Sequence, residues 1–392
     1  MKFQQLILLI DPSVKEWAIE ARLLRWLTFL WLSVGLVILF SASYPLANSY
    51  YGDGFYYVKR QMAWAVLGCV GFNFMVHTPL KSLMRVAQWF LLLFLGLIGV
   101  TVIPGLGITI NGATRWLSVG AFPIQPSELI KPFLVLQGAQ VFGLWPSLKP
   151  AIRWRWLAIF GAVLVGILLQ PNLSTATFCG MTLFAIAVAS GLPYRSLLTT
   201  GGVGLGLGML SLSMNEYQRQ RIMTFLDPWA DPMENGYQLT QSLMAIGSGG
   251  FWGSGLGLSQ QKWFYLPIQY TDFIFAVYAE EFGFVGSLLL LLMLGVYATL
   301  GLVVALKCTD KFHRLIAIGA TFLLVGQSLI NIGVATGALP TTGLPLPMFS
   351  YGGNSMIASL LSAGLLVRVA RESRQAQVVS LDDRRKKQTQ LK

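Results

Sequence analysis

The chain has 392 residues, of which 55% are hydrophobic and 11% are charged, and its formal net charge is +12. A soluble domain carries about 25% charged residues, so this composition leaves too little polar surface to cover a globule in water. The composition excludes a water-soluble domain and predicts a polytopic membrane protein, because several apolar runs reach the ~20 residues that a membrane-spanning helix needs.

The hydropathy pattern predicts an all-α fold with ten membrane-spanning helices. The strongest run is FGFVGSLLLLLMLGVYATLGLVVAL, from Phe282 to Leu306. The expected spans are 23–43, 60–77, 86–103, 127–144, 155–170, 175–192, 196–214, 282–306, 315–335 and 355–369. We therefore divide the chain into an N-terminal segment 1–22, a transmembrane domain 23–369 and a basic tail 370–392.

The distribution of basic residues predicts the orientation, because Lys and Arg accumulate on cytoplasmic segments. If the spans alternate from a cytoplasmic N-terminus, all but seven of the 28 Lys and Arg residues fall on the cytoplasmic side. The seven exceptions are Lys59, Arg60, Arg115, Lys131, Arg219, Arg221 and Lys262. Both termini are thus expected in the cytoplasm of a plasma-membrane protein. We interpret RRKK at 384–387 as an anchor to anionic lipid and not as a nucleic-acid site.

The sequence predicts no metal site. Its three cysteines, Cys69, Cys179 and Cys308, are isolated, and their spacing suits neither a disulfide framework nor a zinc site. The two histidines, His77 and His313, fall on the expected cytoplasmic side. A histidine base on the outer side is thereby excluded.

A long outer segment, about 215–271, is expected between spans seven and eight. It is rich in Trp, Tyr, Phe, Leu and Met, so we expect it to be ordered and functional. Within it, QLTQSLMAIG has the apolar spacing of a helix that could lie flat on the membrane. GSGGFWGSGLG lets the backbone bend and approach a ligand closely, although its spacing is not that of a phosphate-binding Walker loop.

The segment before the fourth span, NGATRWLSVGAFPIQPSELIKP, collects polar residues at an expected helix start. One interpretation is structural: Ser127 caps the helix, and Glu128 pairs locally with Lys131. The other is functional: Lys131 and Arg115 face a polar cavity and hold an anion. The sequence leaves both open.

Two further segments are expected at the same outer cavity. TGALPTTGLPLPMFSYGGNS, after the ninth span, contains three prolines and cannot form a regular helix. At membrane depth such a backbone requires shielding by protein or a water-filled cavity. In LPIQYTDFIFAVYAEE, Asp272 stands where a polar loop becomes apolar, so it either caps a helix or serves chemistry. Glu280 and Glu281 lie deeper and are predicted to neutralise basic residues such as Lys131.

Several motifs of this chain resemble the SEDS family (shape, elongation, division and sporulation proteins), which includes FtsW and RodA. The motifs are GATRWLSVG, FPIQPSELIKP, RQRIMTFLDPWADP, GYQLTQSLMAIGSGGFWGSGLGLSQQKWFYLP, TDFIFAVYAEEFGFVG and GALPTTGLPLPMFSYGGNS. The similarity runs nearly from end to end of the chain. SQQKWFYLP and the QSL of TQSL are more similar to the FtsW branch than to the RodA branch.

The resemblance implies a GT-C-like membrane fold and a peptidoglycan glycosyltransferase. The implied substrate is lipid II, a disaccharide-pentapeptide on undecaprenyl pyrophosphate, polymerised into β-1,4 glycan at the outer membrane face. The essential aspartate of the family falls on Asp272 through TDFIF. It is expected to act as the general base of an inverting displacement, because a sugar hydroxyl is a poor nucleophile until a base removes its proton.

The expected leaving group is a pyrophosphate, whose developing charge needs cations. The candidate substrate-binding residues are Arg115, Lys131, Arg219, Arg221, Lys262, Gln125, Ser127, Glu128 and Ser350. No cofactor is required by the sequence, although Mg²⁺ or Mn²⁺ could assist. The resemblance also implies partners: a class B penicillin-binding transpeptidase and other proteins of the division machinery at the septum.

This sequence departs from the family pattern at two places. Many members have LPEAHTDFIF, where this chain has LPIQYTDFIF, with Ile268 and Tyr270 in place of an acidic residue and a histidine. The common PDLGT turn here reads PNLST, with Asn172. Three alternatives stay open at this point: a lipid II flippase, a RodA-type polymerase for elongation, and a non-catalytic scaffold of the division machinery.

Overall fold

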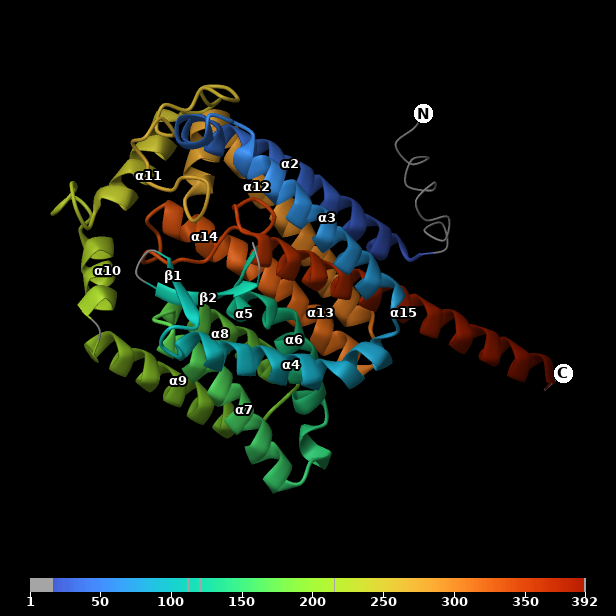
Figure 1. The fold of residues 1–392 in the computed structure, drawn as a ribbon. Coiled ribbons are helices and arrows are strands. Elements are labelled where there is room, and N and C mark those ends of the chain that lie inside the picture. Colours follow the sequence, from blue (N-terminus) through green and yellow to red (C-terminus); the bar gives the residue numbers. More distant parts are fainter. Residues whose placement is uncertain (1–16, 111–112, 120–121, 215, 391–392) are drawn as a thin grey trace.

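The computed structural model describes residues 17–390 apart from 111–112, 120–121 and 215 (Figure 1). The first helices are α2 (Ile19–Tyr51), α3 (Tyr56–His77) and α4 (Leu80–Val102). Strands β1 (Gly107–Ile110), β2 (Ala113–Val119) and β3 (Phe122–Ile124) follow. The next elements are α5 (Pro126–Leu129), α6 (Lys131–Gly143), the short 3₁₀ helix η2 (Trp145–Ser147), α7 (Pro150–Leu169), α8 (Leu173–Ala189) and α9 (Tyr194–Met214). The last are α10 (Glu216–Leu226), α11 (Tyr237–Ser248), α12 (Ile274–Lys307), α13 (Lys311–Thr321), η3 (Phe322–Gly326), α14 (Gln327–Ala335) and α15 (Gly353–Gln390).

The fold is that of a polytopic helical membrane protein. Each expected span overlaps a helix, and the described residues contain 7 helical segments that are long and apolar enough to cross a membrane. These are α2, α4, α7, α9, α12, the α13–α14 unit Lys311–Ala335 and Gly353–Ser373 of α15. Of the three remaining expected spans, α3 has 22 residues but is not among these 7, α8 is apolar but shorter, and α6 has only 13 residues.

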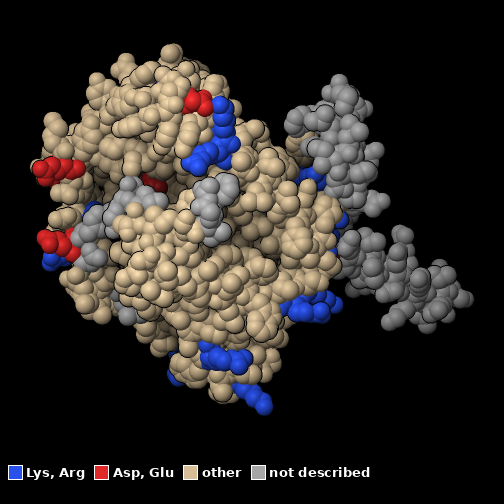
Figure 2. Space-filling model, in the orientation of Figure 1, with Lys and Arg blue, Asp and Glu red and all other residues tan. Residues whose placement is uncertain are grey.

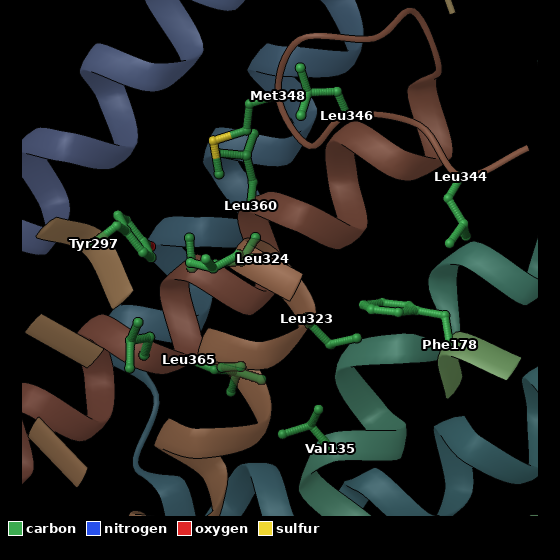
Figure 3. Close-up of a cluster of buried hydrophobic side chains, with 14 of the residues drawn as sticks. Val135, Phe178, Tyr297, Leu323, Leu324, Leu344, Leu346, Met348, Leu360 and Leu365 are labelled. Carbon is green, nitrogen blue, oxygen red and sulfur yellow. The ribbon is translucent and has the colours of Figure 1, made fainter. Parts of the chain in front are cut away.

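The α13–α14 unit and α15 form the centre of the bundle, since 72% of the most apolar 18-residue stretch of each is buried. The corresponding value is 6% for α9, which therefore lies at the periphery. Between α13 and α14, η3 is a turn of π-helix that places Leu323 and Leu324 in the core. Figure 3 shows these two side chains among Phe178 of α8, Tyr297 of α12 and Leu360 of α15.

A small antiparallel sheet is the exception to the all-helical prediction. The strand order is β1-β2-β3, with Ile108 opposite Trp116 and Leu117 opposite Ile124. The strands are rich in β-branched and aromatic residues, which favour extended backbone. Because the strands are only 3 to 7 residues long, they are too short to stand out in the hydropathy pattern.

Helix α12 begins earlier than the expected span and breaks at Gly283, whose φ of 66° and ψ of −162° suit glycine alone among the residue types. The break removes helical hydrogen bonds, and the glycine-rich segment 250–255 replaces them. Phe284 N donates to Gly250 O at 2.9 Å, and Ser254 N donates to Glu280 O at 3.0 Å. The glycines thus allow one backbone to complete the hydrogen bonds of another.

The long loop 215–271 contains two helices. The predicted helix over QLTQSLMAIG is confirmed as α11. Helix α11 packs against α12 and α14, and Ser242 Oγ donates to Ala335 O at 2.7 Å. Helix α10 extends along the edge of the molecule at the left of Figure 1.

The predicted irregular segment after the ninth span is also confirmed. No helix or strand forms between Ala335 and Gly353, a stretch that the structure describes in full. Its apolar side chains Leu344, Leu346 and Met348 are buried and belong to the core cluster of Figure 3. This segment, residues 336–352, is called the α14–α15 loop below.

The bundle has two distinct ends, and α2 runs from one to the other. At the first, Arg371 donates to Val76 O at 3.0 Å and covers the Trp17 ring at 4.2 Å. At the second, the Tyr57 and Tyr270 rings pack with centroids 4.4 Å apart. We call these the Trp17 end and the Asp272 end. Figure 2 shows a mostly uncharged face, with Lys and Arg along its lower edge and also beside the acidic residues at its upper and left parts.

Candidate active site

Asp272 lies directly before α12 and is partly buried. The helix-capping interpretation is wrong, because the N-cap residue is Phe273 and no described side chain caps this helix start. The main-chain oxygen of Asp272 accepts a hydrogen bond from Asn331 Nδ2 at 2.8 Å. Within the described part of the chain, its carboxylate forms no hydrogen bond or ion pair. A carboxylate in such surroundings is available for chemistry.

Burial raises the pKa of Asp272 to about 6, because transfer out of water disfavours the charged form. The positive charges of Arg221 and Arg115 act in the opposite direction, and the negative charge of Glu128 adds to the increase. The resulting pKa suits a general base that must be deprotonated near neutral pH and must still accept a proton.

Two predicted cations therefore lie within the electrostatic reach of Asp272. Arg115, on β2, donates from Nε to Gln170 O at 3.1 Å and from Nη2 to Pro171 O at 2.7 Å. Arg221, on α10, donates to Thr341 O at 3.3 Å. The sheet, α10 and the α14–α15 loop thus bring two guanidinium groups to one carboxylate.

Lys131 is occupied by the bundle itself. Its ammonium lies 2.6 Å from Glu128 and 2.9 Å from Gln327 Oε1, and its side chain is 3% exposed. The local ion-pair interpretation is confirmed. The cavity that these three residues line has a volume of about 10 Å³, which is room for about one water molecule.

Lys262 is also engaged internally. Its ammonium lies 2.7 Å from Glu281 and 2.9 Å from Ser41 Oγ on α2. The prediction that Glu280 and Glu281 neutralise buried basic residues is confirmed for Glu281 and Lys262, but it is wrong for Lys131, which pairs with Glu128. Glu280 instead accepts hydrogen bonds from Ser259 Oγ at 2.5 Å and from the backbone N–H of Gln260 at 2.8 Å. These buried acids fasten the long loop to α12.

The other predicted site residues have different positions. Arg219 is exposed on α10. Gln125 is partly buried and is the N-cap residue of α5, so the prediction that Ser127 caps this helix is wrong. Ser127 is fully buried, and its hydroxyl has no hydrogen-bond partner in the described ranges. Ser350 is buried and donates to Thr271 O at 2.7 Å, so it supports the backbone beside Asp272.

Two of the three residues that depart from the family pattern, Asn172 and Tyr270, have structural explanations, and Ile268 has none. Asn172 caps α8, with its Oδ1 accepting from Thr175 N at 3.2 Å, a role that asparagine and aspartate fill equally well. Tyr270 packs between Tyr57 and Tyr351, and its hydroxyl donates to Tyr57 Oη at 3.2 Å. An aromatic ring at 270 therefore joins α3 to the α14–α15 loop.

Sequence reasoning missed three buried amides that hold the α14–α15 loop. Gln61 Nε2 donates to Ser350 O at 3.2 Å, and Gln327 Nε2 donates to Pro345 O at 2.8 Å. Asn331 Nδ2 donates to Leu344 O at 2.9 Å. An irregular backbone at membrane depth needs such donors. The available signal was an amide inside an otherwise apolar span, which is costly without a partner.

The part of the chain that the structure describes contains no group of three or more His, Cys, Asp or Glu side chains arranged to hold a metal ion.

A family model described as "Cell cycle protein", which covers the FtsW, RodA and SpoVE proteins, matches residues 21–375. The chain belongs to this family, the SEDS proteins. It is 54% identical to a probable peptidoglycan glycosyltransferase FtsW of Synechocystis, over 95% of this chain and 94% of the relative. It is 47% identical to a putative FtsW of Mesostigma viride, over 93% of this chain and 88% of the relative.

Solved structures agree with this assignment. One, described as showing structural coordination of polymerization and crosslinking by a peptidoglycan synthase complex, has a TM-score of 0.71 and 30% identity, and covers 90% of this chain and 98% of its own. The crystal structure of Thermus thermophilus RodA has a TM-score of 0.65 and 29% identity, and covers 89% and 96%.

Proposed function

We propose that the chain is a peptidoglycan glycosyltransferase of the FtsW type, the activity named for its Synechocystis and Mesostigma relatives. The observation that carries the mechanism is Asp272, a partly buried carboxylate whose pKa is raised to about 6 beside the charges of Arg221 and Arg115.

The proposed substrate is lipid II, and the product is a β-1,4-linked glycan. Asp272 accepts the proton of the acceptor 4-hydroxyl as that oxygen attacks the anomeric carbon of the donor. The bond from this carbon to the undecaprenyl pyrophosphate breaks, and its electron pair leaves with the pyrophosphate. One displacement inverts the α-linked donor to a β product, and Asp272 then releases its proton to water.

Arg115 and Arg221 are proposed to stabilise the charge that develops on the pyrophosphate, since fixed cations in a water-poor site act strongly on a transition state. Their influence on Asp272 supports this role. Lys131 and Lys262 are proposed to act through the fold, because each is buried in an ion pair. Arg219, which is exposed, is left as a candidate for steering the anionic substrate.

The proposed topology is a GT-C-like bundle of ten spans with both termini in the cytoplasm of the plasma membrane. Because α2 runs from the Trp17 end to the Asp272 end, a cytoplasmic N-terminus requires Asp272 on the outer side. The FtsW-type relatives support a role at the division septum. Lipid II with its sugars outside would then meet Asp272 directly.

A class B penicillin-binding transpeptidase is the proposed partner. The similar synthase complex, whose description joins polymerization to crosslinking, supports this pairing. A lipid-linked polymerase and a crosslinking enzyme in one complex can pass the growing glycan between them.

The test is polymerisation of purified lipid II by the purified protein together with its transpeptidase. We expect glycan polymer and released undecaprenyl pyrophosphate. Movement of labelled lipid II between the two leaflets of proteoliposome membranes, without formation of polymer, would contradict the proposal and identify a flippase instead.

A further inference from the structure

Asn331 joins three segments at the candidate active site. It lies on α14, is 1% exposed, and its Nδ2 donates to Asp272 O at 2.8 Å and to Leu344 O at 2.9 Å. Both amide hydrogens therefore point to carbonyl oxygens. The reversed amide would bring its oxygen against the same two carbonyls, so only an asparagine in this orientation satisfies the contact.

Helix α14 presents two amides to the same loop. Gln327 and Asn331 are four residues apart and so share a helix face. They bind the carbonyls of consecutive residues, Pro345 and Leu344. The π-helical turn η3 directly precedes Gln327, and such turns change the rotation of the helix that follows. Asn331 alone of this pair also reaches Asp272.

The residues before Asp272 are held by the α14–α15 loop. Ser350 Oγ donates to Thr271 O at 2.7 Å, and Tyr351 N donates to Tyr270 O at 2.8 Å. The carbonyl oxygen of Asp272 itself is bound by Asn331 of α14, and a buried helix is a more rigid support than a loop. The carbonyl of Asp272 is thus fixed to the centre of the bundle.

We propose that Asn331 is a positioning residue of the transfer reaction: its amide fixes the main chain of Asp272 and so sets where the carboxylate meets the acceptor hydroxyl. This inference rests on the proposed function of Asp272 as general base. A base must lie within hydrogen-bond reach of the proton that it removes. A displacement of about 1 Å can cost about 100-fold in rate.

Three charged groups face the Asp272 carboxylate from three different elements. They are Arg221 of α10, Arg115 of β2 and Glu128 of α5. Loss of the Asn331 contact lets the carboxylate move relative to all three and removes a nearby N–H dipole that favours the charged form. Both effects are expected to raise the pH at which the base becomes deprotonated, because the two cations are the groups that favour ionisation.

The test compares Asn331→Leu with Gln61→Leu, in the full-length protein with its transpeptidase, by measuring kcat and KM for lipid II against pH. Gln61 is a matched control, because it is also a fully buried amide that binds the α14–α15 loop, through Ser350 O and Gly352 N. We expect Asn331→Leu to lower kcat about 100-fold with a small change in KM, and to move the acid limb to higher pH. Gln61→Leu is expected to lower thermal stability and to leave the acid limb in place.

Equal losses in the two variants with unchanged acid limbs would overturn the proposal and leave Asn331 a structural residue. If Asn331→Leu does not fold, Asn331→Asp is the second variant, because aspartate has nearly the same side-chain volume as asparagine. Its added negative charge is expected to move the acid limb further upward, and an unchanged limb would again reject the role. Failure of the proposed function is recognised separately, because wild-type protein would then make no polymer at any pH.

Discussion

The ammonium of Lys262 and the carboxylate of Glu281 lie 2.7 Å apart, with side chains only 3% and 0% exposed. The pair connects the long loop 215–271 to α12, with Lys262 ten residues before Asp272 and Glu281 nine residues after it. Ser41 of α2 completes the pair through hydrogen bonds to both partners. One buried ion pair therefore joins three segments that are distant in sequence. It is a structural support for the active site.

Removal of one partner of this pair is expected to be strongly destabilising. Lys262→Met leaves Glu281 buried without its cation, which costs about 3–5 kcal/mol in comparable cases. The double variant Lys262→Met, Glu281→Gln is expected to recover much of the loss. Thermal unfolding in detergent measures both variants. The exposed pair Lys59–Asp53 supplies a control, since Lys59→Met is expected to change little. Equal effects of Lys262→Met and Lys59→Met on thermal unfolding would contradict the assignment of the Lys262–Glu281 pair as a structural support.

Gly283→Ala is expected to destabilise the protein by about 1–3 kcal/mol. Its φ of 66° is strained for alanine, and an added Cβ would lie 2.3 Å from Gly253 N. Gly295, in the same helix, has open space around an added Cβ. Gly295→Ala is therefore expected to be neutral or slightly stabilising. A comparison of the two melting temperatures tests whether the break in α12 requires glycine.

The raised pKa of Asp272 predicts that the ionised carboxylate, the form active as a base, lowers the stability of the folded protein. Its pKa is about 6 in the folded protein and ~3.9 in an unfolded chain, so the folded state binds more protons between these values. Stability contributed by the protonated carboxyl is fully present below pH ~4 and is lost as pH rises towards 6. Asp272→Asn is therefore expected to raise the melting temperature at pH 7.5 and to change it little at pH 4. An unchanged melting temperature at both values would show that burial does not perturb this group.

Arg221→Gln is expected to lower activity and to move its acid limb to higher pH. The positive charge of Arg221 favours the ionised form of Asp272, so its loss raises the pKa of that carboxyl. Arg219→Gln on the same helix is the control, because Arg219 is exposed and does not contribute to the Asp272 pKa. A shift of similar size in both variants would indicate a general change in surface charge.

The features that could be predicted from the sequence are those that depend on residues close together in the chain. Apolar runs gave the membrane helices, and the prolines after Ala335 gave the irregular loop. The motif TDFIF pointed to Asp272, and the burial and charges around that residue support its selection.

The missing features depend on contacts between distant residues. Nothing near Lys262 in the sequence indicates that Ser41 and Glu281 enclose it, 221 and 19 residues away. Gly283 is one of 41 glycines, and its positive φ and the approach of the Gly253 backbone appear only in the folded structure. Asn331 is a polar residue inside the predicted span 315–335, and its two carbonyl partners come together only in the folded bundle.

The most direct measurement compares wild type with Asp272→Ala in the lipid II polymerisation assay, with the transpeptidase present and membrane insertion verified for both. The proposed mechanism predicts a loss of about 100- to 10,000-fold in the rate of glycan formation, the range that a general base contributes. Glycan formed by the alanine variant at the wild-type rate would contradict it.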